Sequence, residues 1–587
     1  MKTAKKLCDK IHIIGSSLGN RGVWYLIIFS PKLSRQLKTL HYFILLCFCG
    51  EKVEKMSIIV EVKQGKLEGK ENTSVLSGKK FYTFSGIPYA KPPVGDLRFR
   101  PPKPAEKWEG ILDATYEKDI CIQKHTILGD ILSGSEDCLH LNVNTPENPN
   151  NIKTPKAVIV YFHGGGYVWG SGTEEWYSAD YLVEQDVIVV TLNFRLHVLG
   201  FLNLDIPECP GNVGLKDQAL ALKWLRENIT KFGGDANNIS IFGTSAGASS
   251  VHFLMLSPLT KGLFDKAILQ SGSAMVAGMF SYDHQSIAKE LGKKLDFPGG
   301  SEYELLDFLK KQDASELTRV SDLMRLEFLH KYPGRAKAGL FVPSVETVKD
   351  GALLPDIPEN LLKSVHPIPV ICGVTNSEGI LFIRLTSPDT VTKLKTDFSI
   401  ILSNNFKIDP ALVPDLSDKI KKYYFGEKEV DLGEELFNLY TKLLFYRFYD
   451  SIENLSKSST PPYIYEFCYD GNLNLFKKLV ASGIHPEPKG ACHADDLFYI
   501  FSMKILPHAS PLSGNDREVI KNMTSLWANF VKTGTPKQDL WELSTYSEPR
   551  YLRIDRELTL VDGKVYGKRL EFLKNLLDPV IESDRIL

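Results

Sequence analysis

Hydrophobic runs of strand length recur along this chain, and stretches with helical spacing separate them. Directly after Met56, the sequence Ser-Ile-Ile-Val-Glu-Val alternates polar and apolar residues, which predicts the first strand of an opening hairpin. Five later runs are short, rich in β-branched residues and mostly apolar, as buried strands are: Ala157–Phe162, Val187–Leu192, Ile239–Phe242, Ala267–Leu269 and Ile368–Cys372. Between the second and third runs, Asp217–Phe232 repeats apolar residues at helical spacing.

This alternation predicts an α/β fold with a central, mostly parallel sheet. Strands that are apolar along their whole length are buried on both faces, and helices on both sides of a parallel sheet produce that pattern. Ligands of such sheets bind beyond the carboxyl ends of the strands. We therefore expect the functional residues in the loops that follow the five runs.

The first 55 residues follow a different pattern. Their two apolar runs, Val23–Phe29 and Tyr42–Cys49, fall well short of the roughly 18 to 20 apolar residues of a membrane-spanning helix. The second run has the length of a signal-peptide core, but the stretch of about forty residues before it is unusually long for such a peptide. We predict that residues 1–55 are an extension outside the fold and that residues 56–587 form one domain.

The composition narrows the class of protein. With 587 residues, 43% of them hydrophobic, the chain can bury a large core. Its formal net charge of -1 at pH 7 gives no electrostatic reason to expect a nucleic acid partner. None of its nine cysteines lies in a CxxC or Cys/His pattern with zinc spacing. We expect no metal, no cofactor and no stable membrane span, and the sequence makes no prediction of oligomeric state.

A serine between two glycines follows the third run. The sequence Gly243-Thr-Ser245-Ala-Gly247 connects the strand Ile239–Phe242 to a helical pattern, Ala246–Leu256. A strand that turns sharply into a helix needs small flanking residues and exposes the serine hydroxyl above the sheet. A second match, Gly15-Ser-Ser17-Leu-Gly19, lies in the extension, where no earlier strand could supply an oxyanion loop. We predict Ser245 as a nucleophile.

The sequence His163-Gly164-Gly165-Gly166 follows the first run directly. Consecutive glycines let backbone N–H groups approach an oxyanion closely, although a flexible glycine-rich loop would have the same composition. A phosphate-binding loop is excluded because no Lys-Ser/Thr follows. The predicted donors are the N–H groups of Gly165, Gly166 and Ala246.

A serine nucleophile needs a histidine base and an acid that orients it. Of the three histidines late in the chain, His485 and His508 adjoin prolines, which favours surface loops. His493 lies between Lys489-Gly490 and an aromatic helical pattern, and we predict it as the base. Glu378 lies just past the strand ending at Cys372, where an acid is expected, although a solvated loop glutamate would have the same sequence context.

Taken together, these residues resemble the type-B carboxylesterases, which include cholinesterases and arthropod detoxifying esterases. The resemblance runs from about Ser57 to beyond Tyr551, and its motifs are Phe84–Ala90, Pro92–Gly95, Leu97–Phe99, Ser135–Leu139, Asn212–Gln218 and Phe232–Asp235. It implies the α/β-hydrolase fold and a triad of Ser245, Glu378 and His493 that cleaves small-molecule carboxyl esters through an acyl-enzyme. The substrates it implies are xenobiotic or lipid-like esters.

The resemblance also implies supporting features. Cys121 and Cys138 fall on a disulfide of the family, which would contribute about 3 kcal/mol by closing its loop. Arg98 and Glu136 fall on an ion pair that pins this loop, and Ser271 and Asp496 fall on supporting positions near the base. In cholinesterases, the corresponding loop carries a tryptophan that stacks on the ammonium group. No tryptophan lies between Cys121 and Cys138, so we expect choline esters to be poor substrates.

Two alternatives stay open. The protein could be a specialised hormone or pheromone esterase, or a catalytically silent adhesion-type homologue, although the complete triad favours an enzyme.

For the compartment, Met56 resembles the start of intracellular members and favours the cytoplasm. Secretion is the alternative, and five sequons would then permit glycosylation, at Asn72, Asn228, Asn238, Asn454 and Asn522.

Overall fold

The computed structural model describes residues 58–581 except 126–130, 334, 336–338, 366, 382–389, 432, 483, 505–511 and 538. The predicted extension, with Ser17, lies outside the described residues, as does His508.

The strands of the described chain are β1 Ile58–Val62, β2 Gly65–Thr73, β3 Lys80–Pro88, β4 Ile111–Asp113, β5 Gln123–His125, β6 Ile131–Ser133, β7 His140–Thr145, β8 Lys156–Phe162, β9 Ile188–Leu192, β10 Asn203–Ile206, β11 Cys209–Pro210, β12 Gly234–Thr244, β13 Lys266–Gln270, β14 Val370–Thr375, β15 Tyr463–Phe467, β16 Arg550–Ile554 and β17 Leu558–Asp562. The α-helices are α1 Glu174–Tyr177, α2 Asp180–Val183, α3 His197–Phe201, α4 Val213–Asn228, α5 Ala246–Leu256, α6 His284–Lys294, α7 Glu302–Lys310, α8 Ala314–Lys331, α9 Pro358–Leu361, α11 Thr390–Thr396, α12 Ile400–Ser403, α13 Val413–Phe425, α14 Glu434–Leu444, α15 Tyr446–Ser456, α16 Leu475–Val480, α17 Gly514–Thr533 and α18 Gly567–Leu577. The short 3₁₀ helices used below are η4 Ile229–Phe232 and η7 Asp495–Tyr499.

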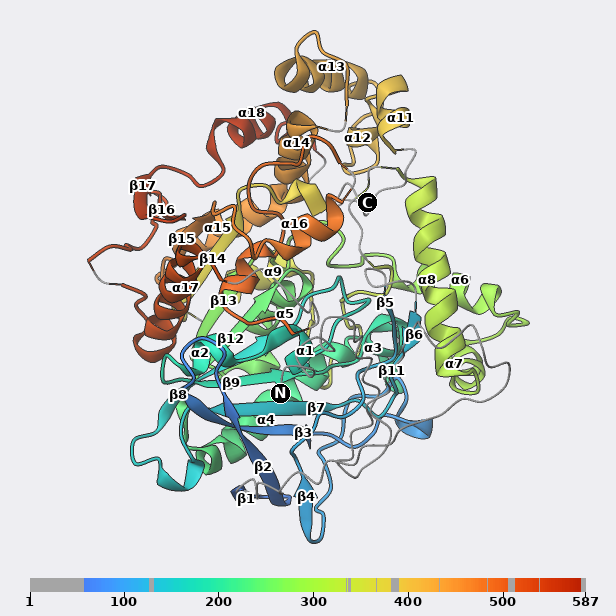
Figure 1. Cartoon of the computed structure of the whole chain (residues 1–587). Helices are drawn as coiled ribbons and strands as arrows, with labels where there is room; N and C mark the ends of the chain where they lie inside the picture. The colour runs from blue at the N-terminus through green and yellow to red at the C-terminus, as the bar shows by residue number, and fades with distance from the viewer. Residues whose placement is uncertain are drawn as a thin grey trace, which may run out of the picture. The chain divides into compact units, whose positions relative to one another are not determined.

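One large sheet forms the centre of the domain (Figure 1). Its order is β1-β2-β3-β7-β9-β8-β12-β13-β14-β15-β16-β17, with β4 paired to β2. The strands from β9 to β16 are parallel, and the pairs at both ends of this order are antiparallel. The prediction of a mostly parallel α/β sheet is confirmed.

Both faces of the sheet are covered. Alternate residues of β8 enter different hydrophobic clusters, because successive side chains of a strand point to opposite faces. Val158 and Val160 pack in the cluster that contains residues of α4 and α5, whereas Ile159 and Tyr161 pack in the cluster that contains residues of α2 and α17. Burial on both faces explains why the central strands are apolar along their length.

Several predicted element boundaries differ from the observed ones. The fifth strand begins at Val370 rather than Ile368, because Pro369 has no N–H for the ladder, and it continues past Cys372 to Thr375. Glu378 therefore lies immediately beyond the end of this strand. The predicted helix Asp217–Phe232 begins earlier, at Val213, and its last turn is the 3₁₀ helix η4.

The sequons differ in accessibility. Asn228 is fully buried and donates its side-chain amide to the carbonyl of Trp224 at 3.0 Å, so it cannot accept a glycan in the folded protein. Asn454, in contrast, is exposed on α15. The expectation that all five sequons permit glycosylation was therefore wrong for Asn228.

No helix among the described residues has both the length and the apolar character needed to cross a bilayer.

Candidate active site

Ser245 occupies a strained turn between β12 and α5. Its backbone has φ 59° and ψ -125°, a conformation that residues other than glycine rarely adopt. A Cβ on Gly247 would lie 2.0 Å from the carbonyl oxygen of Phe162 in β8, so only glycine fits there. The N–H of Ser245 donates to the carbonyl of Gln270 in β13 at 2.9 Å. The turn that the sequence predicted is present, and it exposes Ser245 beyond the carboxyl end of β12.

The glycine loop after β8 lies beside this turn. A Cβ on Gly164 would be 3.2 Å from the Cβ of Ser245, because β8 and β12 are parallel neighbours. Gly165 and Gly166 have φ of 108° and 63°, and the Gly165 carbonyl accepts N–H bonds from Val168 and Trp169. Ala246 opens α5, so its N–H has no partner within the helix. The structure therefore brings the loop and the helix N-terminus together at Ser245.

His163 begins this loop and is fully buried. Its ring stacks on Phe194 with centroids 4.3 Å apart, and its Nδ1 contacts the Gly164 carbonyl at 2.8 Å. Burial lowers the pKa of His163 to about 4, so the ring is neutral at physiological pH. We infer a packing role for this histidine rather than proton transfer.

Glu378 and His493 are in direct contact. Nδ1 of His493 lies 2.5 Å from Oε2 of Glu378, and their side chains are 6% and 0% exposed. The other oxygen, Oε1, accepts the hydroxyl of Ser271 at 2.6 Å and the N–H of Thr375 at 2.8 Å. Three contacts thus fix the carboxylate. His485, in contrast, lies on an exposed loop.

The two loops that carry these residues are linked to each other. The N–H of Ser377 donates to the Ala491 carbonyl at 3.0 Å. The N–H of Ala491 in turn donates to the side-chain oxygen of Asn376 at 2.8 Å. These reciprocal bonds place Ser377, which precedes Glu378, next to Ala491, which lies two positions before His493.

Two aspartates follow His493. Asp495 accepts the N–H of Cys492 at 2.7 Å, which closes the turn around the histidine. Asp496 accepts the hydroxyl of Tyr465 at 2.8 Å, and burial raises its pKa to about 7. Both supporting residues implied by the resemblance thus act on the pair: Ser271 donates its hydroxyl to Glu378, and Asp496 interacts electrostatically with Glu378 and His493.

Sequence reasoning missed two residues that contact the loops of Glu378 and His493. They are Thr441 of α14 and Phe445 at the C-cap of that helix. The N–H of Gly379, next to Glu378, donates to the hydroxyl of Thr441 at 2.8 Å. The ring of Phe445 lies 5.8 Å from the ring of His493, centroid to centroid. No local signal marks either residue, because both belong to an ordinary amphipathic pattern.

The disulfide implied by the resemblance is present between Cys121 and Cys138. Arg98 binds both carboxylate oxygens of Glu136, at 2.7 and 2.5 Å. It also donates to the carbonyls of Lys310 and Gln312, at 3.0 and 2.7 Å. The disulfide loop is therefore pinned to the connection between α7 and α8.

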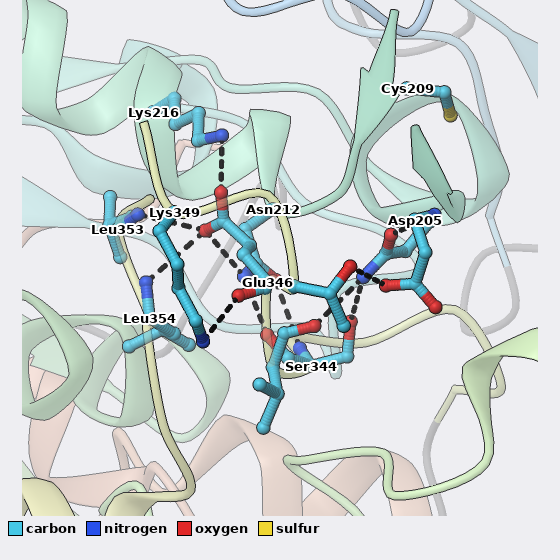
Figure 2. Close-up of polar contacts among 12 residues, drawn as sticks. Asp205, Cys209, Asn212, Lys216, Ser344, Glu346, Lys349, Leu353 and Leu354 are labelled. Carbon is cyan, nitrogen blue, oxygen red and sulfur yellow. Dashed lines mark hydrogen bonds and ion pairs between the residues drawn. The ribbon is translucent and has the colours of Figure 1, made fainter. Parts of the chain in front are cut away.

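A buried polar network fixes the segment 339–354, which passes beside the glycine loop. A Cβ on Gly339 would lie 2.9 Å from the carbonyl oxygen of Gly166. Further along, Glu346 is fully buried and pairs with Lys216 of α4 at 2.5 Å. Figure 2 shows Glu346 between Lys216, the amide of Asn212 and the backbone of the following turn. The amide of Asn212 bonds this segment instead of capping α4.

Comparisons with known proteins identify the family of this chain. Residues 56–573 match the model of the carboxylesterase family. The chain is 34% identical to Esterase FE4 of Myzus persicae, with 82% of this chain and 86% of the relative covered. It is 33% identical to the juvenile hormone esterase of Heliothis virescens, with 83% and 87% covered. The crystal structure of the juvenile hormone esterase of Manduca sexta aligns with a TM-score of 0.78 and 30% identity, over 89% of this chain and 100% of that one. The chain therefore belongs to the carboxylesterase family and is a carboxylesterase.

Proposed function

We propose that this carboxylesterase cleaves small uncharged esters through an acyl-enzyme on Ser245, with His493 as the base and Glu378 as its orienting acid. The observation that carries the proposal is the buried 2.5 Å contact between Glu378 and His493. The strained turn at Ser245, at the same edge of the sheet, supports it. In this proposal residues 56–587 form the catalytic domain, and the extension of residues 1–55 supplies none of the groups that react.

In the first half of the reaction, the hydroxyl oxygen of Ser245 attacks the ester carbonyl carbon. His493 accepts the serine proton, and Glu378 stabilises the resulting imidazolium. The carbonyl oxygen becomes an oxyanion that accepts N–H bonds from Gly165, Gly166 and Ala246. The C–O bond to the alcohol then breaks, and the imidazolium gives its proton to the leaving alkoxide.

In the second half, water attacks the acyl-enzyme carbonyl. His493 takes the water proton, the oxyanion forms again on the same donors, and the acid leaves as Ser245 regains its proton. No step needs an oxidant, a reductant or a metal ion.

Substrate selection follows from the charge of the substrate. A cationic choline ester must be desolvated on entering the site, and the disulfide loop has no tryptophan to offset that cost. Xenobiotic or lipid-like esters carry no charge at the same position.

Similarity to two juvenile hormone esterases supports a second candidate, a hormone-type esterase. A panel of aryl acetates, butyrates, longer acyl esters and a juvenile hormone separates the two by kcat/KM.

The test of the mechanism is covalent labelling. A fluorophosphonate should attach to Ser245, because its phosphoryl oxygen occupies the same N–H donors as the ester oxyanion. Ser245→Ala should lower kcat by about 10⁶-fold, whereas the control Ser17→Ala should leave it unchanged. An adduct mapped by peptide mass to any other residue would overturn the assignment.

A further inference from the structure

Helix α14 packs directly against the loop that carries Glu378. Thr441 is buried, and its hydroxyl accepts the N–H of Gly379 at 2.8 Å while donating to the carbonyl of Phe437 at 2.8 Å. A Cβ on Gly379 would lie 2.1 Å from that same Phe437 carbonyl, so the loop contacts the helix backbone itself. The N–H of the peptide bond after Glu378 is therefore held by this hydroxyl, while the carbonyl of the same peptide accepts the N–H of Leu381 at 3.3 Å.

The same side of the helix also reaches the base. Phe437, Thr441 and Phe445 are spaced four residues apart, which places them on one face of an α-helix. Phe445, at the C-cap, is buried and packs its ring near that of His493. Phe437 shares a separate hydrophobic cluster with Ile380, which follows the acid, and with Cys492, which precedes the base. One helix face thus contacts both loops.

We propose that Thr441 is a positioning residue, which orients Glu378 toward Nδ1 of His493 by fixing the peptide between Glu378 and Gly379. This inference rests on the triad proposed above. Without the hydroxyl, the Gly379 N–H would be buried and unpaired, and the loop would shift to find another acceptor. A shifted carboxylate stabilises the imidazolium less well, although the substrate would still bind as before.

The charged and titratable groups around the pair come from several elements. Those that interact with Glu378 itself are Lys442 of α14, Tyr449 of α15, Tyr465 of β15, Cys492 of the base loop and Asp496 of η7. Glu466 of β15 acts on Lys442, and Asp495 of η7 acts on Cys492. Substitutions at Thr441 change none of these charges. A change in the pH profile of such a variant therefore reports the placement of Glu378.

The experiment compares Thr441→Val, which keeps the shape but removes the hydroxyl, with Thr441→Ser, which keeps the hydroxyl. The matched control is Thr318→Val in α8, because Thr318 is also fully buried and also donates to the carbonyl four residues earlier, that of Ala314, at 2.9 Å. Each variant is assayed for kcat per fluorophosphonate-titrated site, for KM, and for the pH dependence of kcat/KM on p-nitrophenyl butyrate. Thr441→Ala replaces the valine variant if that variant does not fold.

Thr441→Val should lower kcat per site by about ten- to a hundredfold with little change in KM, as expected for a small misplacement of a catalytic group. The acid limb of its pH profile should move to lower pH, and Thr441→Ser should restore both values. Thr318→Val should change stability alone. A Thr441→Val enzyme with the kcat per site and pH profile of the Thr318→Val control overturns the inference.

A double variant tests the route of the effect. In a Glu378→Gln background, Thr441→Val should cause no further loss of kcat, because it acts through a carboxylate that is already absent. A further tenfold or greater loss would overturn the inference. Failure of the proposed triad is a separate outcome, since the wild-type enzyme would then carry no fluorophosphonate on Ser245.

Discussion

Replacing Glu346 with glutamine tests how the segment beside the glycine loop is anchored (Figure 2). Oε1 of Glu346 accepts the N–H groups of Leu353 and Leu354, at 2.9 and 3.2 Å, and the amide of Asn212 at 2.9 Å. Oε2 pairs with Lys216, whose side chain is only 8% exposed. The glutamine oxygen can still accept the three N–H bonds, but its NH₂ group would face the lysine ammonium, donor against donor. The variant thus removes the ionic partner and little else.

The size of the effect follows from this geometry. Breaking a buried ion pair on one side costs about 3–5 kcal/mol, because the remaining charge is uncompensated. This loss of stability has an upper limit, because the lysine can lose its proton instead of staying charged. Neutralising an ordinary lysine at pH 7 costs about 5 kcal/mol. For a folded unit of roughly 500 residues, a loss of 3–5 kcal/mol lowers Tm by about 3–5 °C.

Urea unfolding and thermal melts followed by circular dichroism measure this loss. The control is Asp415→Asn, which breaks the exposed pair Lys419–Asp415 and should change the free energy of unfolding by less than about 0.5 kcal/mol. Adding Lys216→Met to Glu346→Gln should recover part of the loss, since no buried charge is then left. A Glu346→Gln enzyme within about 0.5 kcal/mol of wild type would falsify the reasoning, as would a double variant less stable than the single one.

Two further predictions concern carboxylates elsewhere. Glu378→Gln should keep the fold and lower kcat by about 10⁴-fold, because a neutral amide cannot stabilise the imidazolium of His493; an activity near wild type in a stopped-flow ester assay would contradict this. Glu117 is largely buried, and burial raises its pKa from 4.5 to about 7. The folded state therefore binds this proton more tightly than the unfolded state, and stability is lost as pH rises from 4.5 through 7, by up to about 3 kcal/mol. Glu117→Gln cannot ionise, so its stability relative to wild type should increase between pH 5 and pH 8 in urea titrations; a difference that stays constant with pH would refute this.

The sequence alone predicted the features that are local in the chain. The turn at Ser245 and the glycine loop at Gly164–Gly166 each follow a buried strand within a few residues, and short apolar strands predict a parallel sheet without reference to distant contacts. Family resemblance added the disulfide between Cys121 and Cys138, which the structure contains. Periodicity was least accurate at element ends, where Pro369 delays β14 and α4 begins before its predicted start.

Only the tertiary structure decided which side chains meet. Local context could not distinguish Glu378 from a solvated loop glutamate, and its contact with His493 joins residues 115 positions apart. The contacts of Thr441 with Gly379 and of Glu346 with Lys216 carry no sequence signal. The physical reason is that a hydrophobic pattern specifies which face of a helix or strand is buried, but not the element against which it packs. The order of strands in the sheet and the docking of α14 determine that choice, and they bring the polar groups of distant segments into contact.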